Sequence, residues 1–446
     1  MSITEDTIAA IATAPGGAIG LIRMSGPRAL DIASKHFSPW PKGLVDRRLI
    51  HGWWRDTHGN DLDEALLAVM RGPRSYTGED VVEVHVHGGA LGLEQCLDAC
   101  VLSGARIAEP GEFTRRAFLN DRLDLTRAEG VADIIAAQTD RALKQARALL
   151  KGELYRKAQH IRTLMLTLRA RIEVNIDFIE EDVPIIDTSL LSGESMTILK
   201  SLRTLSESYT QGRLARDGAR VAIVGSPNAG KSSLFNALCK SDRAIVTDIE
   251  GTTRDTLEEK IDVGGIPVTL IDTAGLREAP GLVERLGVER TMEEVKRADL
   301  VIHVIDGLSS HIESLDVGID DGIDAKVLKV ASKKDLLSER TDETMLAFSS
   351  RTGEGLDAML EECRRLLGGR LDDGSGLVLT RKRQVVAVNR SAQAMETVLE
   401  GLQKGVPTEL VAVDLQEALD ALSELVGATS IEDVLDHLFS EFCIGK

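Results

Sequence analysis

The sequence predicts a multidomain protein in which an α/β domain is inserted into a helical domain. The chain has 446 residues, which is too long for a single hydrophobic core. Residues 218–369 alternate strand-like apolar runs with helical spacing, as in a parallel-sheet α/β domain. The segments on both sides also carry apolar residues at helical spacing, which indicates one helical bundle interrupted by the insertion.

Four segments follow from these patterns. Residues 1–118 are expected to form an N-terminal α+β domain, and residues 215–376 the inserted α/β domain. Residues 119–214 and 377–446 are expected to be the two halves of the helical domain. Proline is almost absent from the first of these halves, and a linker rich in Gly, Asp and Ser ends the insertion.

The elements of the N-terminal segment are expected to be short. Two apolar runs separated by a Pro-Gly-Gly turn predict strands over 7–12 and 18–24. Further elements predicted there are a helix over 28–36, strands over 63–70 and 80–86, and a helix over 91–102. In the helical segments, helical spacing runs through 128–150, 164–178, 384–402 and 415–442.

Composition excludes several classes of protein. The net charge of −18 argues against binding of nucleic acid or membrane by the whole surface, so a nucleic-acid partner needs a local basic patch. No apolar run is long enough to cross a membrane and no secretory leader is present, so we expect a cytoplasmic protein. The five cysteines form no C-x-x-C pair, which suits a reducing compartment.

A phosphate-binding loop is the strongest local signal. The apolar run 221–224 predicts a strand, residues 225–232 match G-x-x-x-x-G-K-S, and helical spacing follows. Glycines allow successive N–H groups to point at one anion, and the helix N-terminus adds its positive end. The expected contacts with the nucleotide are Asn228, Ala229, Gly230, Lys231, Ser232 and Ser233. The alternative, a glycine turn that merely precedes a helix, is the weaker interpretation of a full match in this context.

Two further segments predict the magnesium site and the γ-phosphate sensor. Asp272 follows an apolar run, so its carboxylate can reach Mg²⁺ through water, while Thr273, Ala274 and Gly275 continue a D-x-x-G motif. The Mg²⁺ ligands are expected to be Ser232 and Thr253, the latter only when the γ-phosphate is bound. The surrounding polar segment 247–255 also holds Thr247 and Thr252.

Guanine is the predicted base. A carboxylate can accept hydrogen bonds from N1–H and N2–H of guanine, and Asp335, in the sequence Ser332-Lys333-Lys334-Asp335, follows a predicted strand. Adenine has no matching pair of donors. Backbone N–H groups of Ser349, Ser350 and Arg351 are expected to cover the guanine O6. By itself the lysine-rich turn reads as a solvated surface turn, but its place in the order of motifs favours a base site.

The hydrolytic residue is not determined by these motifs. Leu276 occupies the position where many small GTPases place a glutamine that orients the attacking water. Glu278 and Glu284 are the nearest acidic replacements, and spacing does not choose between them. An arginine finger or a cation is also needed to offset charge in the transition state.

The ordered set resembles the translation-factor-related class of GTPases, with Ser332 where N-K-x-D motifs usually have asparagine. The shorter hydroxyl predicts weaker guanine binding. The whole chain resembles the MnmE (TrmE) family of tRNA-modifying GTPases. The segments that carry this resemblance are Ala14–Gly17, Tyr76–Asp80, His87–Gly89, Pro110–Phe113, Arg116–Asn120 and the terminal Phe442–Lys446.

The resemblance implies an N-terminal folate-binding and dimerisation domain, a helical domain and an inserted Ras-like P-loop G domain. It implies a homodimer that works with the FAD-dependent protein MnmG to add an aminomethyl-type group, such as carboxymethylaminomethyl, to C5 of the wobble uridine of tRNA. The implied cofactors are GTP, Mg²⁺, K⁺ and 5-formyl- or 5,10-methylene-tetrahydrofolate.

The resemblance also implies roles for particular residues. Glu284 corresponds to the glutamate that positions water, and Cys443 to a cysteine important for modification. The implied K⁺ contacts are Asn228, Thr247, Ile249 and Thr252. The implied folate contacts are Arg23, Glu83, Arg122 and Lys446.

Alternative interpretations accompany these assignments. Without the resemblance, Arg23 and Glu83 read as exposed strand residues, and His85 and His87 as ordinary strand histidines rather than metal ligands. The basic residues of 115–116 and 381–383 read as solvated faces that could meet tRNA phosphates. A GTP-switched assembly factor without an enzymatic role, for example in ribosome biogenesis, explains residues 218–370 equally well but makes no use of the N-terminal residues. A folate enzyme with a vestigial G domain is a third possibility, excluded if GTP is hydrolysed.

Overall fold

A computed structural model gives the fold of the chain. It describes residues 6–177, 187–240, 258–272, 292–308, 325–336, 345–368, 378–427, 432–440, 442 and 444–445. These residues belong to two compact units. Unit 1 comprises residues 1–132, 149–170 and 412–446, and unit 2 comprises residues 133–148 and 171–411.

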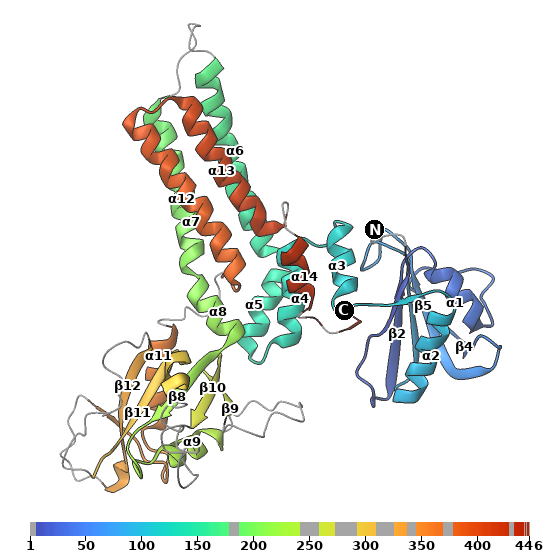
Figure 1. Ribbon diagram of the computed structural model, residues 1–446, viewed down its shortest axis with the longest axis horizontal. Helices are drawn as coiled ribbons and strands as arrows, with labels where there is room; N and C mark the ends of the chain where they lie inside the picture. Colours follow the sequence, from blue (N-terminus) through green and yellow to red (C-terminus); the bar gives the residue numbers. More distant parts are fainter. Residues whose placement is uncertain are drawn as a thin grey trace. The chain divides into compact units, whose positions relative to one another are not determined.

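A mixed sheet with two helices on one face forms the N-terminal part of unit 1. Its strands are β1 (Ile8–Ile11), β2 (Ile19–Ser25), β3 (Phe37–Ser38), β4 (Ile50–Arg55), β5 (Asp61–Met70), β6 (Val81–His87) and β7 (Arg106–Ile107), in the order β3-β4-β5-β6-β2-β1-β7 (Figure 1). All neighbours are antiparallel except β1 and β7. Helices α1 (Ala29–His36) and α2 (Ala90–Leu102) bury Ile32 and Leu93 against Ile22 and Val84 of the sheet.

The predicted elements of this region are confirmed, while β3, β4 and β7 escaped prediction. Strand β4 lacks simple alternation because Gly52 lies at a crowded position, where a Cβ atom would approach the Phe37 ring to 2.6 Å. Strands β3 and β7 have two residues each. Elements of this length carry too little periodicity to predict.

The helices of unit 1 bring the middle and the end of the chain together. They are α3 (Glu112–Leu119), α14 (Glu432–Ser440) and the larger parts of α4 (Leu125–Ala136), α6 (Glu153–Asp177) and α13 (Thr408–Val426). Helices α3 and α14 are in contact (Figure 1). Leu125 and Ala128 share a core with Leu438, Phe439 and Phe442, so residues about 300 positions apart fold as one unit.

The helices of unit 2 include a long pair. Helix α7 (Thr188–Glu207) packs along α12 (Lys382–Lys404), as Figure 1 shows, and Arg203 pairs with Glu396 at 2.8 Å. Helix α5 (Asp140–Leu150) begins where the Thr139 hydroxyl accepts a hydrogen bond from Ala142 N–H at 3.2 Å. This cap explains why the predicted helical run 128–150 is two helices, α4 and α5. The run 415–442 is likewise two helices, α13 and α14.

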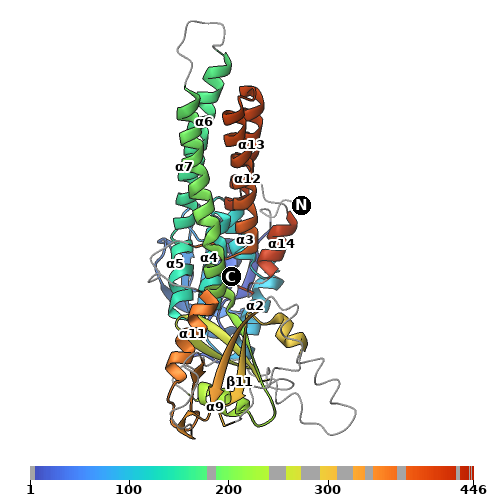
Figure 2. The same ribbon diagram turned by 90° about the vertical axis from the view of Figure 1, so that its left-hand side faces the viewer.

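An α/β sheet forms the rest of unit 2. Its strands are β8 (Ala219–Val224), β9 (Glu258–Val263), β10 (Ile266–Asp272), β11 (Leu300–Asp306), β12 (Lys326–Ser332) and β13 (Leu346–Ala347), in the order β13-β12-β11-β8-β10-β9. Helices α9 (Lys231–Cys239) and α11 (Leu356–Gly368) pack on it (Figure 2). The sheet is parallel as expected except for β9, which pairs antiparallel with β10 through a turn at Gly264 and Gly265.

Helix α8 (Tyr209–Asp217) links the helices of unit 2 directly to this sheet, because Gly218 alone separates it from β8. Arg213 of α8 pairs with Asp299 at 2.7 Å, and the other carboxylate oxygen of Asp299 accepts Arg220 N–H of β8 at 2.9 Å. The start of β8 is therefore anchored to the preceding helix.

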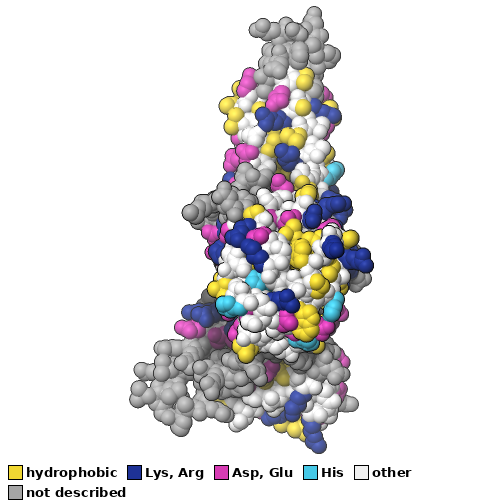
Figure 3. Space-filling model, turned by 90° about the vertical axis from the view of Figure 1, so that its right-hand side faces the viewer, with side chains coloured by type: hydrophobic (Ala, Val, Ile, Leu, Met, Phe, Trp, Pro, Cys, Tyr) yellow, Lys and Arg dark blue, Asp and Glu magenta, His cyan; other side chains and the backbone are white. Residues whose placement is uncertain are grey.

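The surface mixes charges of both signs. On the face shown in Figure 3, Lys and Arg side chains gather in several groups although the chain as a whole carries −18. Among the described residues, no helix combines the length and the apolar character needed to cross a membrane.

Candidate functional site

The predicted nucleotide residues of unit 2 meet at one edge of its sheet. The phosphate loop follows β8, Asp272 ends β10, Ser332 ends β12, and residues 348–351 follow β13. Parallel strands bring their carboxyl ends to the same edge, which is the usual ligand site of such sheets. The strand order places β8 between β10 and β11, so the phosphate loop lies near the centre of this edge.

The backbone of the phosphate loop adopts conformations that require its glycines. Gly225 has φ of +154°, and a Cβ atom there would lie 2.2 Å from the Val304 carbonyl oxygen. Gly230 and Asn228 have φ of +101° and +64°. Left-handed residues of this kind turn successive N–H groups toward one point. The loop therefore has the fold of an anion cradle, opening directly into α9 at Lys231.

The side chains of the loop have distinct positions. The Lys231 ammonium donates to the Ser226 carbonyl at 2.8 Å and is buried, so it lies over the loop itself. Ala229 is buried, while Ser232 and Ser233 are exposed in the first turn of α9. Asp272 is 2% exposed at the end of β10. The hydroxyl of Ser232 and the carboxylate of Asp272 are the hard oxygen groups that Mg²⁺ prefers.

Ser332 lies against the phosphate loop. A Cβ atom on Gly230 would be 3.3 Å from Ser332 Cβ and 3.4 Å from its Oγ. The Ser332 side chain is therefore close to Gly230 of the phosphate loop. The Ser332 hydroxyl is buried and has no hydrogen-bond partner among the described residues. Its short side chain reaches the loop by contact but makes no bond there.

Lys333 and Asp335, which are expected to recognise the guanine base, follow Ser332 in the chain. Lys333, with φ of +62°, pairs with Asp306 at 2.6 Å, and this hydrogen bond holds the pKa of Asp306 below its usual range. Asp335 is exposed in the short 3₁₀ helix η2 (Lys334–Leu336). Asp306 was not predicted from the sequence, although it ends an apolar strand, as Asp272 does.

The segment after β13 is joined by a backbone hydrogen bond to the segment that holds Lys333 and Asp335. Lys334 N–H donates to Phe348 O at 3.0 Å, and Ser349 N–H donates to Glu354 O at 2.9 Å. The Ser349 hydroxyl accepts Arg351 N–H at 3.3 Å. Among the three residues expected to cover guanine O6, Ser350 alone has an N–H with no acceptor in the described part of the chain. The arrangement thus favours Ser350 as the donor.

Several predicted residues lie outside the described residues. They are Thr247, Ile249, Thr252, Thr253, Thr273, Ala274, Gly275, Glu284, Cys443 and Lys446.

A second cluster forms in unit 1, where β2 and β6 pair Arg23 with Glu83. The Arg23 guanidinium bonds the Glu83 carboxylate at 2.7 and 2.8 Å, and it also donates to the Gly445 carbonyl at 3.1 Å. It lies 5.7 Å from the centre of the Phe113 ring, within cation–π range. Arg23 and Gly445 are 422 residues apart, so the fold brings the chain end to the strand pair.

Arg122 lies close to this region on the loop after α3. Its Nε donates to the Ser75 carbonyl at 3.2 Å, and its side chain packs against Gly78. The neighbouring Tyr76 is bonded to Thr114 at 2.9 Å, and burial raises the pKa of its hydroxyl. Three of the four predicted folate residues are described, and two of these, Arg23 and Glu83, are in direct contact.

Two basic residues expected on solvated faces are instead buried. Arg116 is fully buried and bonds Asp6 at 2.6 Å, Glu112 at 2.9 Å and Glu79 at 3.2 Å. Arg381 is 9% exposed and pairs with Asp133 at 2.9 Å. These residues hold their units together, because each neutralises carboxylates that burial would otherwise penalise. The prediction of solvated faces was wrong for both.

The other polar groups considered have ordinary roles. His87 pairs with Asp63 at 2.7 Å, and this hydrogen bond raises the pKa of the imidazole. No three His, Cys, Asp or Glu side chains of the described residues form a metal-binding group. Cys96, Cys100, Cys239 and Cys363 are free thiols.

The strand–loop–helix unit, Asp272 and the base-side residues at one sheet edge define a P-loop GTPase domain. Two family models together span most of the chain. The MnmE helical domain model matches residues 125–443, and the model for the N-terminus of the GTP-binding protein TrmE matches residues 7–122.

Two curated relatives extend this result to the full length. A tRNA modification GTPase MnmE of Heliobacterium modesticaldum is 43% identical over 468 residues, covering 99% of both chains. One of Aquifex aeolicus is 42% identical over 451 residues, covering 99% of this chain and 100% of the relative. The chain belongs to the MnmE (TrmE) family of tRNA modification GTPases.

Proposed function

We propose that this protein couples GTP hydrolysis to modification of the wobble uridine in tRNA. In this proposal a homodimer works with the FAD-dependent protein MnmG, adding an aminomethyl-type group to C5 of the base from a tetrahydrofolate one-carbon donor. The observation that carries the proposal is the sheet edge of unit 2, where the phosphate loop meets Asp272 on one side and the Ser332–Asp335 segment on the other. Membership of the MnmE family of tRNA modification GTPases supports tRNA as the substrate.

Different residues of the phosphate loop and its neighbours would bind the phosphates, the base and Mg²⁺. Backbone N–H groups of the loop and the Lys231 ammonium hold the phosphates, and Asp335 with Ser350 N–H selects guanine. Ser232 and Thr253 would hold Mg²⁺, which offsets charge on the β- and γ-phosphates. Thr247, Thr252, Thr273, Ala274 and Gly275 would complete the nucleotide contacts.

Hydrolysis requires a group to position water, and Leu276 cannot do so. We assign this role to Glu284, in accordance with family membership. Asn228, Thr247, Ile249 and Thr252 would hold K⁺, which offsets charge in the transition state when two G domains pair. Asn228 has a left-handed backbone and is exposed in the phosphate loop, which supports its proposed contact with a shared cation.

The N-terminal cluster is the proposed folate site, formed by Arg23, Glu83, Arg122 and Lys446. A folate carries both a pterin with hydrogen-bond donors and a glutamate carboxylate, so one acidic and several basic side chains suit it. The contact between Arg23 and Gly445 brings the terminal segment to this site. We propose that Cys443, in the same terminal segment, takes part in modification there.

The role of potassium is tested by GTP turnover in K⁺ and in Na⁺ at equal ionic strength. We expect turnover to be faster in K⁺ by an order of magnitude or more, with a rate per protein that rises with protein concentration as G domains pair. Equal rates in the two salts would reject the K⁺ role.

The role of Glu284 is tested by Glu284→Ala, with Glu278→Ala as the matched control. Because the residue acts on the transition state, we expect GTP affinity to be nearly unchanged and turnover to fall by about 100-fold or more. The Glu278→Ala variant should retain most of the activity. Reversal of this pattern would transfer the role to Glu278.

The folate site is tested by calorimetric titration of the full chain with 5-formyl-tetrahydrofolate. Wild type should bind and Arg23→Ala should not, whereas a GTP-switched assembly factor would show no binding in either. This experiment separates the proposal from that alternative.

A further inference from the structure

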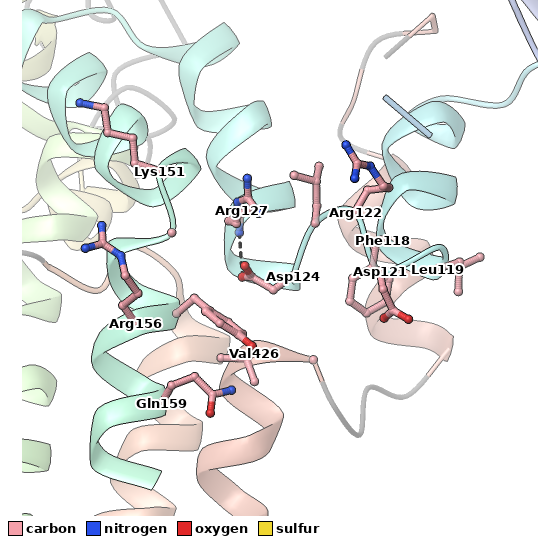
Figure 4. Close-up of a pocket in the computed structure, with 14 residues that line it drawn as sticks. Phe118, Leu119, Asp121, Arg122, Asp124, Arg127, Lys151, Arg156, Gln159 and Val426 are labelled. Atoms are coloured by element: carbon pink, nitrogen blue, oxygen red, sulfur yellow. Dashed lines mark hydrogen bonds between the residues drawn. The ribbon is translucent and has the colours of Figure 1, made fainter. Parts of the chain in front are cut away.

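A pocket in unit 1 shares only Arg122 with the sites described so far. It has a volume of about 700 Å³ and lies among α3, the start of α4, the start of α6 and the end of α13, all within that unit. Figure 4 shows Lys151, just before α6, and Arg156 of α6 on one side, Arg122 on the other, and Arg127 between them. A volume of this size lies within the roughly 300–1,000 Å³ typical of ligand sites.

The pocket is basic within an acidic protein. The residues that line it include four Lys or Arg and two Asp, a net charge of +2, whereas the whole chain carries −18. Two carboxylates line the pocket, and one of them, Asp124, already accepts N–H bonds from Thr126 at 2.9 Å and from Arg127 at 3.1 Å. The local field therefore favours an anion.

Two of the four cations are oriented by the main chain. Arg127 Nε donates to the Leu150 carbonyl at 3.1 Å, and Arg122 Nε donates to the Ser75 carbonyl at 3.2 Å. Among the described residues, no group accepts a hydrogen bond from the terminal nitrogens of either guanidinium. A guanidinium held at Nε with its terminal nitrogens available is suited to bind phosphate oxygens.

The other two cations have no anionic partner in the described part of the chain. Lys151 and Arg156 are exposed, and neither forms an ion pair with any residue that the structure describes. Tyr155 lies between them in sequence, lines the same pocket and is 36% exposed. Cations for phosphate and an aromatic face for a base are the pair of features that single-stranded nucleic acid requires.

We propose that this pocket binds a segment of the tRNA substrate, with backbone phosphates on Lys151, Arg156 and Arg127 and a nucleotide base on Tyr155. This inference rests on the tRNA substrate proposed above. It identifies where a protein of charge −18 can meet a polyanion, a local basic patch that composition alone requires but does not locate. Arg122 lies at the boundary with the proposed folate site and is left unchanged in the test.

The test measures binding of the full-length protein to a transcribed tRNA with uridine at its wobble position, over a range of KCl concentrations. In the variant Lys151→Gln/Arg156→Gln, we expect affinity near physiological salt to fall about tenfold or more. The slope of log affinity against log salt should fall by about 1.5 to 2, since two phosphate contacts are lost. Lys157→Gln is the matched control, because Lys157 is an exposed neighbour on α6 that does not line the pocket.

Tyr155→Ala provides an independent arm. Stacking does not depend on counterion release, so this variant should weaken binding about tenfold while its salt slope stays that of wild type. Different slopes in the charge variant and the aromatic variant would support the pocket as a nucleotide site. A loss of folded structure in both variants would not give two different salt slopes.

Several results would overturn the proposal. They are no binding of tRNA by the wild-type chain, equal affinity and slope in the charge variant and wild type, and equal losses in the charge variant and Lys157→Gln. If the charge variant instead loses affinity for a pentaglutamyl folate and keeps tRNA binding, the pocket is a site for a small polyanion. GTP turnover is measured in parallel, so failure of the proposed GTPase mechanism is recognised separately.

Discussion

The nucleotide edge of unit 2 and the Arg23–Glu83 cluster of unit 1 are assembled in opposite ways. At the nucleotide edge, one contiguous loop with left-handed residues forms the phosphate cradle. The other predicted contacts of this edge lie where neighbouring parallel strands end. In unit 1, ion pairs join residues far apart in the sequence, such as Arg23 with the end of the chain and Arg116 with Asp6. The first site depends on local conformation, the second on long-range charge pairing.

Because the two regions are assembled differently, we expect variants in one to change activity and variants in the other to change stability. A variant at the nucleotide edge should lose activity and keep its fold, because the loop is positioned by the strand and helix around it. A variant in the buried ion pairs of unit 1 should lose stability, because removing one partner leaves unpaired charges in the interior. Four predictions test this contrast, starting with the largest effect.

The largest effect is expected from Arg116→Ala. The change leaves Glu79, which is 11% exposed, without its arginine partner, and it leaves Glu112, which is 4% exposed, with Arg106 as its remaining arginine partner. We expect unit 1 to lose about 3–5 kcal/mol of unfolding free energy. Hydrogen exchange of β1 and β2 measures this locally, which a whole-chain melting curve does not.

The control for this variant is Arg55→Ala. Arg55 and Asp61 form a pair at 2.6 Å with both side chains well exposed, so its loss should cost no more than about 1 kcal/mol. Equal protection in the two variants would contradict the contrast between the two regions.

The next effect is expected from Lys231→Ala. Loss of the ammonium that lies over the phosphate loop should reduce GTP turnover about 100- to 1,000-fold. Hydrogen exchange of β2 in unit 1 should not change. Lys240→Ala, at the exposed end of α9, is the control and should keep nearly full turnover. A Lys231→Ala variant that retains a tenth of the activity would show that the lysine does not hold the phosphates.

A smaller, pH-dependent effect is expected from Glu112→Gln. Burial opposes ionisation of Glu112, but the hydrogen bond from Arg106 and those from Glu109 N–H and Arg116 outweigh it and lower the pKa of the carboxyl. A carboxyl with a lowered pKa stabilises the fold above its unfolded-state pKa, and this stabilisation is lost as pH falls through the folded-state value. The stability gap between wild type and Glu112→Gln should therefore be wide at pH 7 and narrow toward pH 3. Urea unfolding at several pH values measures the gap, and a gap independent of pH would contradict the assignment.

The smallest effect is expected from Ser332→Asn. An asparagine can extend a hydrogen bond to the phosphate loop, which the buried serine contacts without bonding, so guanine-nucleotide affinity should rise about fivefold. Ser332→Ala should leave affinity nearly unchanged, since the hydroxyl has no partner among the described residues. Calorimetric titration with GDP measures both variants. Weaker binding by Ser332→Asn would mean that Gly230 leaves too little room.

Local patterns predicted much of this protein. The strand–loop–helix unit, the order of the guanine motifs, four strands of the first sheet and three of the second could be predicted because each depends on a few consecutive residues with strong conformational preferences. The breaks at Thr139 and between α13 and α14 were missed because helical spacing continues across them, although Thr139 is a good helix cap. The antiparallel direction of β9 was not predicted. Apolar spacing identifies a strand but does not give its direction, which here depends on the turn at Gly264 and Gly265.

The sequence by itself determined the chemistry of the nucleotide site, since the phosphate loop carries its own conformation in Gly225, Gly230 and the helix that follows. Only the tertiary structure decided which charges are used up and which remain available. Arg116 and Lys151 look alike in sequence, yet the fold buries the first among three carboxylates and leaves the second at the edge of a pocket. The physical reason is that the residue type gives the charge of a side chain, whereas contacts between distant segments decide which opposite charges lie next to it.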